Sequence, residues 1–294
     1  MKCSTMIELR DSTAEPMTYV DAHVHLWDPD QLRYDWLAAV PPLAHKHLPQ
    51  DFVVDTAPAV PARWVFVECG GPPVEEVRWV EALAAKEQRI AAIVAGARMN
   101  EGRATHAAID ALSSHSLVRG VRHNFQDESD PTYCCSTAFI EGTRRLGKAG
   151  LTFDVCCRAP QLPSVRKLVQ ECPDTQFVLD HCGKPPIRTG QLDPWRQALC
   201  EIAALPNIVC KLSGLVTEAD MQAWRTSDLT PYVDHVLEVF GPQRLMYGGD
   251  WPVVRLASTY GRWRDAALSL ISRLNAVERA HVLSGTATRT YRLH

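Results

Sequence analysis

Residues 19–26 read YVDAHVHL, a short run rich in β-branched and other apolar residues. Seven further runs of the same kind follow, and their starts lie 25 to 45 residues apart. This spacing suits one strand, one helix and two loops in each repeating unit. The predicted strands are Tyr19–Leu26, Trp64–Cys69, Ile90–Ala97, Val118–Phe125, Leu151–Cys157, Gln176–His181, Asn207–Leu212 and Arg244–Gly249.

The segments between these runs show the spacing of amphipathic helices. Apolar residues recur at intervals of three and four in Val74–Lys86 and in Leu162–Glu171. A third segment, Pro231–Phe240, has the same pattern and stops at Gly241-Pro242, a C-terminal signal. Because strands alternate with helices, we expect a parallel sheet. Eight such units in roughly 250 residues predict an α/β chain closed into a single (β/α)₈ TIM-type barrel.

The barrel is predicted to form one domain over residues 18–294, because no linker or low-complexity segment divides it. Residues 1–17 are polar and mixed in charge, and we interpret them as a disordered leader. The first connection, residues 28–63, is longer than the others and rich in Trp, Tyr and Pro. We expect it to form an extended loop over the mouth of the barrel.

The composition argues against several classes of protein. Of the 294 residues, 46% are hydrophobic and 22% are charged, as in ordinary globular proteins. The 31 basic side chains do not exceed the 34 acidic ones, so nucleic acid is not an expected partner. The longest apolar runs fall far short of the ~20 residues of a membrane span, and no secretory signal is recognisable. We therefore expect a cytoplasmic protein without a membrane partner, whose ten cysteines are mostly reduced. No pattern indicates an oligomeric state.

Reactive groups of such barrels lie where the strands end. His23 and His25 are two residues apart on the first strand, so both are expected to point to one face. His181 ends the sixth predicted strand, and Asp250 follows the eighth. An isolated H-x-H pair is more often a surface or core feature, but its place in this pattern favours a site. Neutral imidazoles can bind a divalent metal or polarise a carbonyl, and a facing carboxylate can take a proton from water.

These residues carry a resemblance to the amidohydrolase superfamily. It narrows to the sugar-lactonase branch, which includes L-fuconolactone and L-rhamnonolactone hydrolases, and it extends from Tyr19 to Leu293. The matching stretches are VDAHVHLWDP (20–29), VRGVRHNFQDE (118–128), FVLDHCGKPPIR (177–188), LDPWRQAL (192–199), LPNIVCKLSGLVTEAD (205–220) and RLMYGGDWPV (244–253).

The resemblance implies water as nucleophile and Asp250 as general base. It also implies that His23, His25 and His181 face the scissile carbonyl, either directly or through one divalent metal, with zinc preferred, held by these histidines and Asp250. Many superfamily members carry a lysine on the fourth strand and a histidine on the fifth, and this sequence has neither. We therefore expect at most one ion. Since some relatives with this gap work without metal, the need for an ion stays open.

Further residues near the strand ends are candidates for substrate binding. Sugars present many hydroxyls and an apolar ring face, which suit charged side chains and tryptophan. A structural salt bridge is an alternative role for Glu68, and the others could be ordinary strand-end or packing residues. The candidates are Trp27, Glu68, Arg122, His123 and Lys211, with Arg158, Lys184 and Trp251 as weaker ones.

The combined interpretation is a hydrolase that opens a small sugar lactone to the aldonic acid. Its enzymatic alternative is a metal-dependent decarboxylase of an unsaturated carboxylic acid on the same scaffold. That branch usually keeps the fifth-strand histidine, which is missing here. A third alternative is a barrel whose site has decayed to a binding role, and the retained histidines and Asp250 speak against it.

Overall fold

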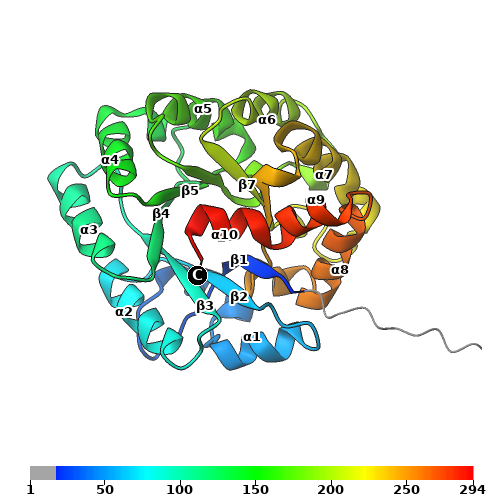
Figure 1. The fold of residues 1–294 in the computed structure, drawn as a ribbon, viewed down its shortest axis with the longest axis horizontal. Helices are drawn as coiled ribbons and strands as arrows, with labels where there is room; N and C mark the ends of the chain where they lie inside the picture. Colours follow the sequence, from blue (N-terminus) through cyan, green and yellow to red (C-terminus); the bar gives the residue numbers. More distant parts are fainter. Residues whose placement is uncertain (1–17, 294) are drawn as a thin grey trace, which may run out of the picture.

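A computed structural model describes residues 18–293 and contains one eight-stranded parallel sheet. The strands pair in chain order, each with the next, and curve into a barrel (Figure 1). They are β1 Val20–Val24, β2 Arg63–Val67, β3 Ile90–Gly96, β4 Val118–Asn124, β5 Thr152–Cys156, β6 Phe177–Leu179, β7 Ile208–Leu212 and β8 Leu245–Tyr247. All eight strands coincide with the predicted runs.

The last strand returns to the first through the residues that follow it. The amide of Asp250 donates to the carbonyl of His23 at 2.8 Å, and the amide of His25 donates to the carbonyl of Trp251 at 2.7 Å. Closure therefore occurs at the level of Asp250, which brings this residue beside the two histidines of β1.

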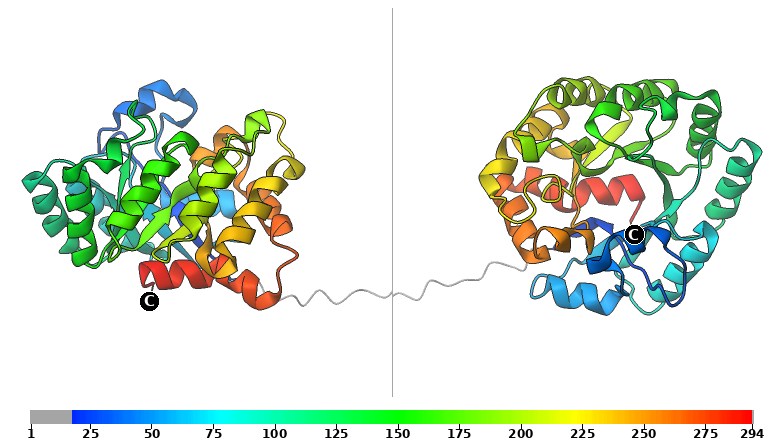
Figure 2. Two further views of the ribbon diagram at one scale, coloured as in Figure 1. Left: turned by 90° about the horizontal axis from the view of Figure 1, so that it is seen from above. Right: turned by 180° about the vertical axis from the view of Figure 1, so that it is seen from behind.

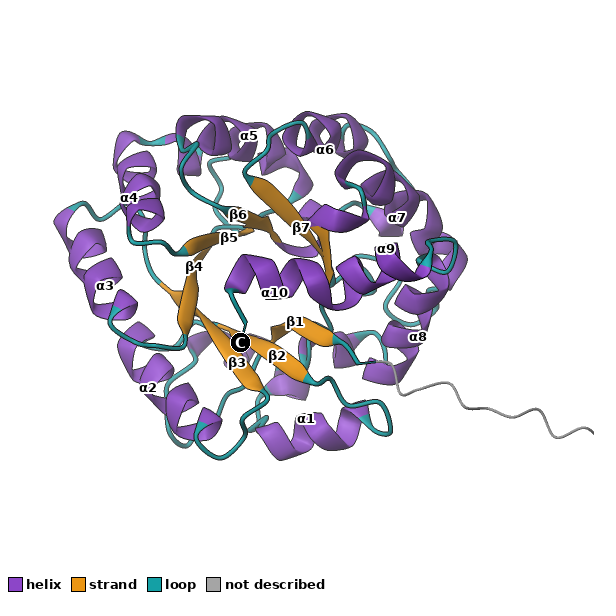
Figure 3. Cartoon of the chain, in the orientation of Figure 1, coloured by secondary structure: helices purple, strands orange, loops and turns teal. Residues whose placement is uncertain are grey.

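Most of the helices surround the barrel in Figure 3, and the C-terminal helix crosses it. The helices are α1 Pro49–Thr56, α2 Pro73–Ala84, α3 Arg103–Ser113, α4 Thr137–Lys148, α5 Leu162–Glu171, α6 Trp195–Ala203, α7 Thr226–Phe240, α8 Tyr260–Leu270, α9 Ala276–Ala280 and α10 Thr286–Tyr291. The predicted (β/α)₈ barrel is confirmed.

The structure differs in detail from two of the predicted segments. The helix expected from Pro231 begins at Thr226, where the Asp228 carboxylate accepts the Arg225 amide at 2.8 Å and so starts the helix earlier. Pro231 falls in its second turn, where it removes a single backbone hydrogen bond. The first connection is not a bare loop, because it includes α1. The part before α1 lies at the opposite end of the barrel from α10 (Figure 2).

The C-terminal segment closes the other end of the barrel. Helix α10 crosses the middle of the ring of strands in Figure 1. Its Tyr291 and Ala287 pack, together with Leu293, against apolar side chains in the lower barrel. These lumen residues include Val20, Ala22, Val65, Val67, Ala92, Val94, Val178 and Met246. The lower lumen is therefore a packed apolar core, and polar side chains gather only above it.

An irregularity in β1 decides which residues reach the lumen. Asp21 pairs with Trp64 and Val24 with Phe66, so β1 advances three residues while β2 advances two. Such a bulge lets two consecutive residues face the same side. Ala22 joins the apolar lumen, and His23 lies above it with its ring toward His25.

Some expectations concern residues beyond this description. The leader at residues 1–17 lies outside the described residues, as does residue 294. The nine cysteines within the described part of the chain are all free. Between residues 18 and 293 there is no helix with the length and apolar character needed to cross a membrane.

Candidate active site

His23, His25, His181 and Asp250 meet at the end of the barrel where the strands terminate. The Nε2 atoms of His23 and His25 lie 3.1 Å apart. The Oδ1 atom of Asp250 is 3.7 Å from Nε2 of His23 and 3.6 Å from Nε2 of His25. The rings of His23 and His181 are 4.5 Å apart between centroids. The structure thus brings together the four residues that the sequence placed at strand ends.

Backbone and side-chain partners orient two of these imidazoles. Nδ1 of His25 donates to the carbonyl of Val67 at 2.8 Å, which leaves Nε2 turned toward the centre. Nδ1 of His181 lies 2.8 Å from the hydroxyl of Ser213. His181 has a φ of 53°, in the left-handed region that non-glycine residues seldom adopt. A residue keeps such a strained conformation only where surrounding contacts hold it. Here the conformation turns the imidazole of His181 toward Asp250.

The turn carrying Asp250 packs directly on the histidines. A Cβ on Gly248 would lie 2.8 Å from the Cβ of His23, so only glycine fits. His23 and Ser213 fill the space beside this glycine. Asp250 itself has a φ of 55°, a second strained position in the cluster. Close packing on both sides holds its carboxylate in place.

Asp21 joins β1 to this turn from outside the lumen. Its carboxylate accepts the amides of His23 at 3.0 Å and Gly249 at 2.8 Å, and the hydroxyl of Tyr260 at 2.8 Å. Burial raises the pKa of Asp21 to about 7. Asp21 therefore fixes the backbone on both sides of the His23–Asp250 contact without reaching the site.

Beneath His23 lies a layer of buried charges. The ammonium of Lys211 is 2.6 Å from Oδ2 of Asp154, 3.0 Å from Oδ1 of Asp180 and 3.2 Å from Nδ1 of His23. The hydroxyl of Tyr291 donates to Asp154 at 2.6 Å from the α10 side. These groups separate the histidines from the apolar lower lumen.

A second buried ion pair lies beside this layer. Nε of Arg122 donates to Oε1 of Glu68 at 2.7 Å, and its Nη2 donates to the Glu68 carbonyl at 2.7 Å. Its Nη1 lies 3.5 Å from Asp180. Glu68 thus forms a salt bridge, which was the alternative role predicted for it. Glu68 and Arg122 each keep 6% of their surface exposed.

Three predicted substrate contacts do not join the cluster. Lys211 has no exposed surface, and its three donors face His23 and two carboxylates. His123 points away from the lumen, where its ring stacks on Phe139 of α4 at 5.4 Å. Trp27 is buried, and its indole N–H donates to the carbonyl of His45 at 2.8 Å, which anchors the first connection.

Several residues of the site were missed by the sequence analysis. Asp154 and Asp180 face the lumen, and Ser213 supports His181. Lumen-facing alternation along β5 could have found Asp154, because Thr152 and Asp154 share one face. No local pattern indicates Tyr291, whose role depends on α10 folding back under the barrel.

The electrostatics produce neutral imidazoles at His23 and His181 and an ionised carboxylate at Asp250. Burial lowers the pKa of His23 well below its ordinary value, and the nearby Lys211 lowers it further. Burial lowers the pKa of His181 to about 4. Burial alone would raise the pKa of Asp250, but His181, His25 and His23 hold it below its usual range. At neutral pH the site therefore offers one carboxylate base beside the uncharged imidazoles of His23 and His181.

This donor set fits a divalent metal. Potential ligand atoms of His23, His181 and Asp250 lie within 4.8 Å of one another. Nitrogen and carboxylate ligands of this kind suit zinc. A second group, Cys156, Asp180 and His181, meets the same distance, but Asp180 is already paired with Lys211 and Arg122. The geometry therefore favours one ion over two.

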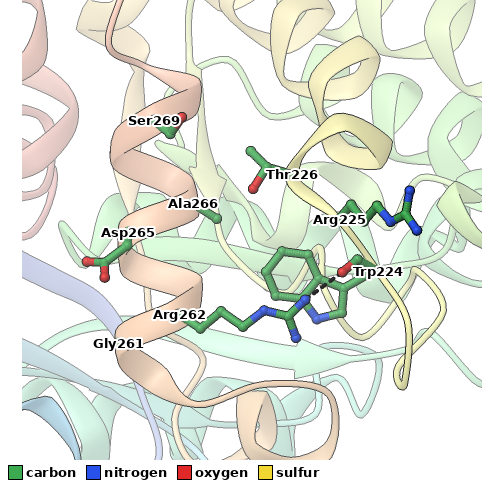
Figure 4. Close-up of a pocket in the computed structure, with 8 residues that line it drawn as sticks. All are labelled: Trp224, Arg225, Thr226, Gly261, Arg262, Asp265, Ala266 and Ser269. Carbon is green, nitrogen blue, oxygen red and sulfur yellow. Dashed lines mark hydrogen bonds between the residues drawn. The ribbon is translucent and has the colours of Figure 1, made fainter.

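A surface pocket between α7 and α8 is separate from this cluster. Figure 4 shows it lined by Trp224, Arg225, Arg262 and Asp265 among others. The Arg262 guanidinium lies 3.8 Å above the Trp224 ring and donates to the carbonyl of the same residue at 2.6 Å. The guanidinium of Arg262 thus already interacts with Trp224. None of the residues that line this pocket belongs to the cluster of His23, His25, His181 and Asp250.

Known proteins resemble this chain over most of its length. Residues 20–293 match the amidohydrolase family. L-fucono-1,5-lactonase of Burkholderia multivorans is 37% identical, and the match covers 93% of this chain and 96% of that protein. L-fucono-1,5-lactonase of Burkholderia ambifaria is 32% identical over 94% and 97% of the two chains. The crystal structure of an amidohydrolase from Burkholderia multivorans with bound zinc has 35% identity and a TM-score of 0.85, covering 95% of this chain and 100% of that one.

Proposed function

The chain belongs to the amidohydrolase family, and we propose that it hydrolyses small sugar lactones to the open aldonic acids. The observation that carries this proposal is the Asp250 carboxylate held among His23, His25 and His181 at the mouth of the barrel. The substantial identity to two L-fucono-1,5-lactonases supports a lactone as substrate.

In the proposed reaction Asp250 acts as general base. Its carboxylate takes a proton from water as the oxygen attacks the lactone carbonyl. The oxyanion that develops is stabilised by imidazole donors, which is commonly the largest electrostatic contribution. The ring C–O bond then breaks, and the alkoxide receives a proton from Asp250 or His181. Because its pKa is lowered, Asp250 is a weak base, which suits an activated ester such as a lactone.

We propose that one divalent metal, zinc by preference, is held by His23, His181 and Asp250, with His25 beside them. When bound, it would act as a Lewis acid toward the carbonyl oxygen. The buried charges favour a cation, since four carboxylates in and above the lumen face two basic side chains. The carboxylates are Glu68, Asp154, Asp180 and Asp250, and the basic residues are Arg122 and Lys211.

The substrate class is proposed to be deoxy-sugar aldonolactones of the fucono or rhamnono type. Glu68 and Arg122 keep exposed surface, whereas Lys211 has none, so we assign contacts with substrate hydroxyls to the former pair. The site has a single hydrolytic centre, which suits a small uncharged ring.

The test is a pH-indicator assay against a panel of aldonolactones, because each turnover releases an acid. The panel also contains an amide, a phosphotriester and an unsaturated dicarboxylate. We expect turnover of the lactones and weak or no reaction of the others, with Asp250→Asn as the inactive control. Decarboxylation of the unsaturated acid without any lactone turnover would replace this proposal with the decarboxylase alternative.

A further inference from the structure

We propose that Lys184 binds the carboxylate of the aldonic acid that ring opening produces, and that Glu218 limits the strength of this binding. The inference rests on the proposed function, because the acid is the product of lactone hydrolysis. An uncharged lactone and water give a carboxylic acid, which loses its proton at neutral pH. The reaction therefore creates one negative charge in the site.

The turn that follows β6 has an unusual backbone. Its four residues, 181–184, have φ angles of 53°, 54°, 68° and 49° in chain order. Only the third is glycine, so three residues with side chains occupy the left-handed region that side chains disfavour. Strain of this kind is concentrated at functional sites. His181 begins the turn and belongs to the candidate site, and Lys184 ends it.

This turn places Lys184 beside His181. The amide of Lys184 donates to the carbonyl of His181 at 2.9 Å, which closes the turn after three residues. In a turn of this size the side chains at the first and fourth positions lie on the same side. Because His181 points toward Asp250, Lys184 is directed to the same end of the barrel. The strained backbone thus serves two side chains of one site.

The ammonium of Lys184 is charged and accessible. Its side chain keeps 16% of its surface exposed, whereas Lys211 has no exposed surface. Burial alone would lower the pKa of Lys184, but nearby acidic groups, including Glu218 and Asp250, outweigh burial and raise it above its ordinary value. A ligand at the mouth of the barrel can therefore reach the charge of Lys184 but not that of Lys211.

Glu218, in the loop after β7, is a loose partner of this ammonium. Nζ of Lys184 lies 3.5 Å from Oε1 of Glu218, and this is the only ion pair of Lys184 among residues 18–293. A direct hydrogen bond between an ammonium and a carboxylate is usually about 2.7–2.9 Å long. Since an ammonium has three N–H donors, Lys184 can accommodate a second, closer acceptor.

The other accessible basic residues of the site are more tightly paired. Arg122 donates to Glu68 at 2.7 Å. Arg158, which follows β5, donates to Asp127 in the loop after β4, also at 2.7 Å. Lys184 is therefore better able than either arginine to take a new anionic partner.

The two members of the Lys184–Glu218 pair should have opposite effects on the product. The lactone is uncharged, so Lys184 contributes more to the affinity for the acid than to the affinity for the lactone. Glu218 competes with the product carboxylate for the same ammonium. It therefore weakens product binding and favours release of the acid.

The experiment is isothermal titration calorimetry of the full chain as purified. The two ligands are L-fuconate, the acid formed from L-fucono-1,5-lactone, and L-fucitol, an uncharged alcohol with the same carbon chain. Lys184→Met removes the charge and keeps an unbranched side chain, and Glu218→Gln removes the competing charge at nearly constant size. Lys167→Met, at an exposed lysine of α5, is the matched control.

We expect Lys184→Met to weaken L-fuconate binding by roughly tenfold, the scale of a hydrogen bond to a charged group. Glu218→Gln should strengthen it by about two- to fivefold, since a partly exposed ion pair no longer competes. Lys167→Met should leave it unchanged. The affinity for L-fucitol should change less than that for L-fuconate in both Lys184→Met and Glu218→Gln, because the alcohol carries no charge.

Weaker L-fuconate binding in both Lys184→Met and Glu218→Gln would overturn the assignment, because a pair that only supports the loops loses its role in either variant. An unchanged affinity in Lys184→Met would overturn it as well. If Lys184→Met fails to fold, Glu218→Gln decides alone, and only tighter binding of the acid supports the proposal.

The lactone assay separates this inference from the proposed function. A wild type that turns over lactones but does not bind L-fuconate would overturn the role of Lys184 alone. L-fuconate binding with the expected response of the variants, but without lactone turnover, would refute the proposed function alone. Absence of both would refute both.

Discussion

Gly214 leaves the space that the imidazole of His181 occupies. A Cβ at this position would lie inside van der Waals contact of Nδ1 and Cγ of His181. Gly214 also has a φ of 62°, which disfavours any side chain. The same histidine receives support from Ser213, so two consecutive residues after β7 define its orientation.

Gly214→Ala is therefore expected to displace His181 and lower kcat, on the order of 10²-fold for an ångström-scale shift. Gly190→Ala is the matched control. Gly190 has a φ of 69° but no atom within 4 Å of the added Cβ. Both variants carry similar backbone strain of roughly 1–2 kcal/mol, but only one carries the clash. Equal kcat values in the two variants would show that His181 does not need this position.

Asp250→Asn is expected to lower kcat by roughly 10²–10⁴-fold while the fold is retained, because the general base is lost. Asparagine is nearly isosteric and preserves the packing of the turn. Steady-state kinetics and a circular-dichroism melt check the two parts of the prediction. Activity above about a tenth of the wild-type value would place the base elsewhere.

Metal content is expected to be at most one divalent ion per chain. Of the two groups of potential ligands among residues 18–293, only His23, His181 and Asp250 contains a carboxylate that is not paired with Lys211 or Arg122. Elemental analysis of the purified protein gives the stoichiometry, and two tightly bound ions would contradict it. Full activity after complete chelation would mean that the imidazoles polarise the carbonyl directly.

Tyr291→Phe is expected to lower kcat, with little change in KM, because Asp154 and Lys211 lose their support beneath His23. It should also lower the free energy of unfolding by about 1.5–3 kcal/mol, the range for hydrogen bonds to charged groups. Tyr247→Phe is the control, because that buried hydroxyl has no hydrogen-bond partner among the described residues. Urea unfolding and steady-state kinetics of both variants measure the difference. Equal losses in the two variants would show that Tyr291 does not support Asp154 and Lys211.

Glu76, in α2, predicts a pH dependence of stability. Burial, reinforced by Glu68, raises its pKa from 4.5 to about 8. The folded state thus binds this proton more tightly than the unfolded state. The resulting stabilisation is complete below pH 4.5 and is lost as the pH rises to about 8. Glu76→Gln resembles the protonated form, so it should be more stable than the wild type at pH 9 and similar to it near pH 4.5.

Thermal melts across this pH range test the Glu76 prediction. Glu75→Gln, on the adjacent and exposed residue, should show no such pH-dependent difference. A constant offset between Glu76→Gln and the wild type at all pH values would refute the assignment to Glu76.

The sequence alone was sufficient to predict the barrel and the clustering of His23, His25, His181 and Asp250. Strand and helix periods are local properties, and eight alternating units leave little choice of architecture. Since reactive groups of a parallel barrel gather at strand ends, His23, His25, His181 and Asp250 could be placed together without coordinates. The prediction that a helix begins at Pro231 was wrong, because a proline in the second turn of a helix resembles a proline at its start.

Only the tertiary structure decided which side chains reach the lumen and which charges pair there. Arg122 and His123 are neighbours on β4 and must face opposite sides, but the bulge in β1 shows that this alternation can shift by one residue. Lys211, Asp154 and Tyr291 lie far apart in the chain, and their pairing depends on barrel closure and on α10 folding beneath it. A buried charge takes whichever partner compensates its desolvation, and that partner is set by the fold rather than by the neighbouring sequence.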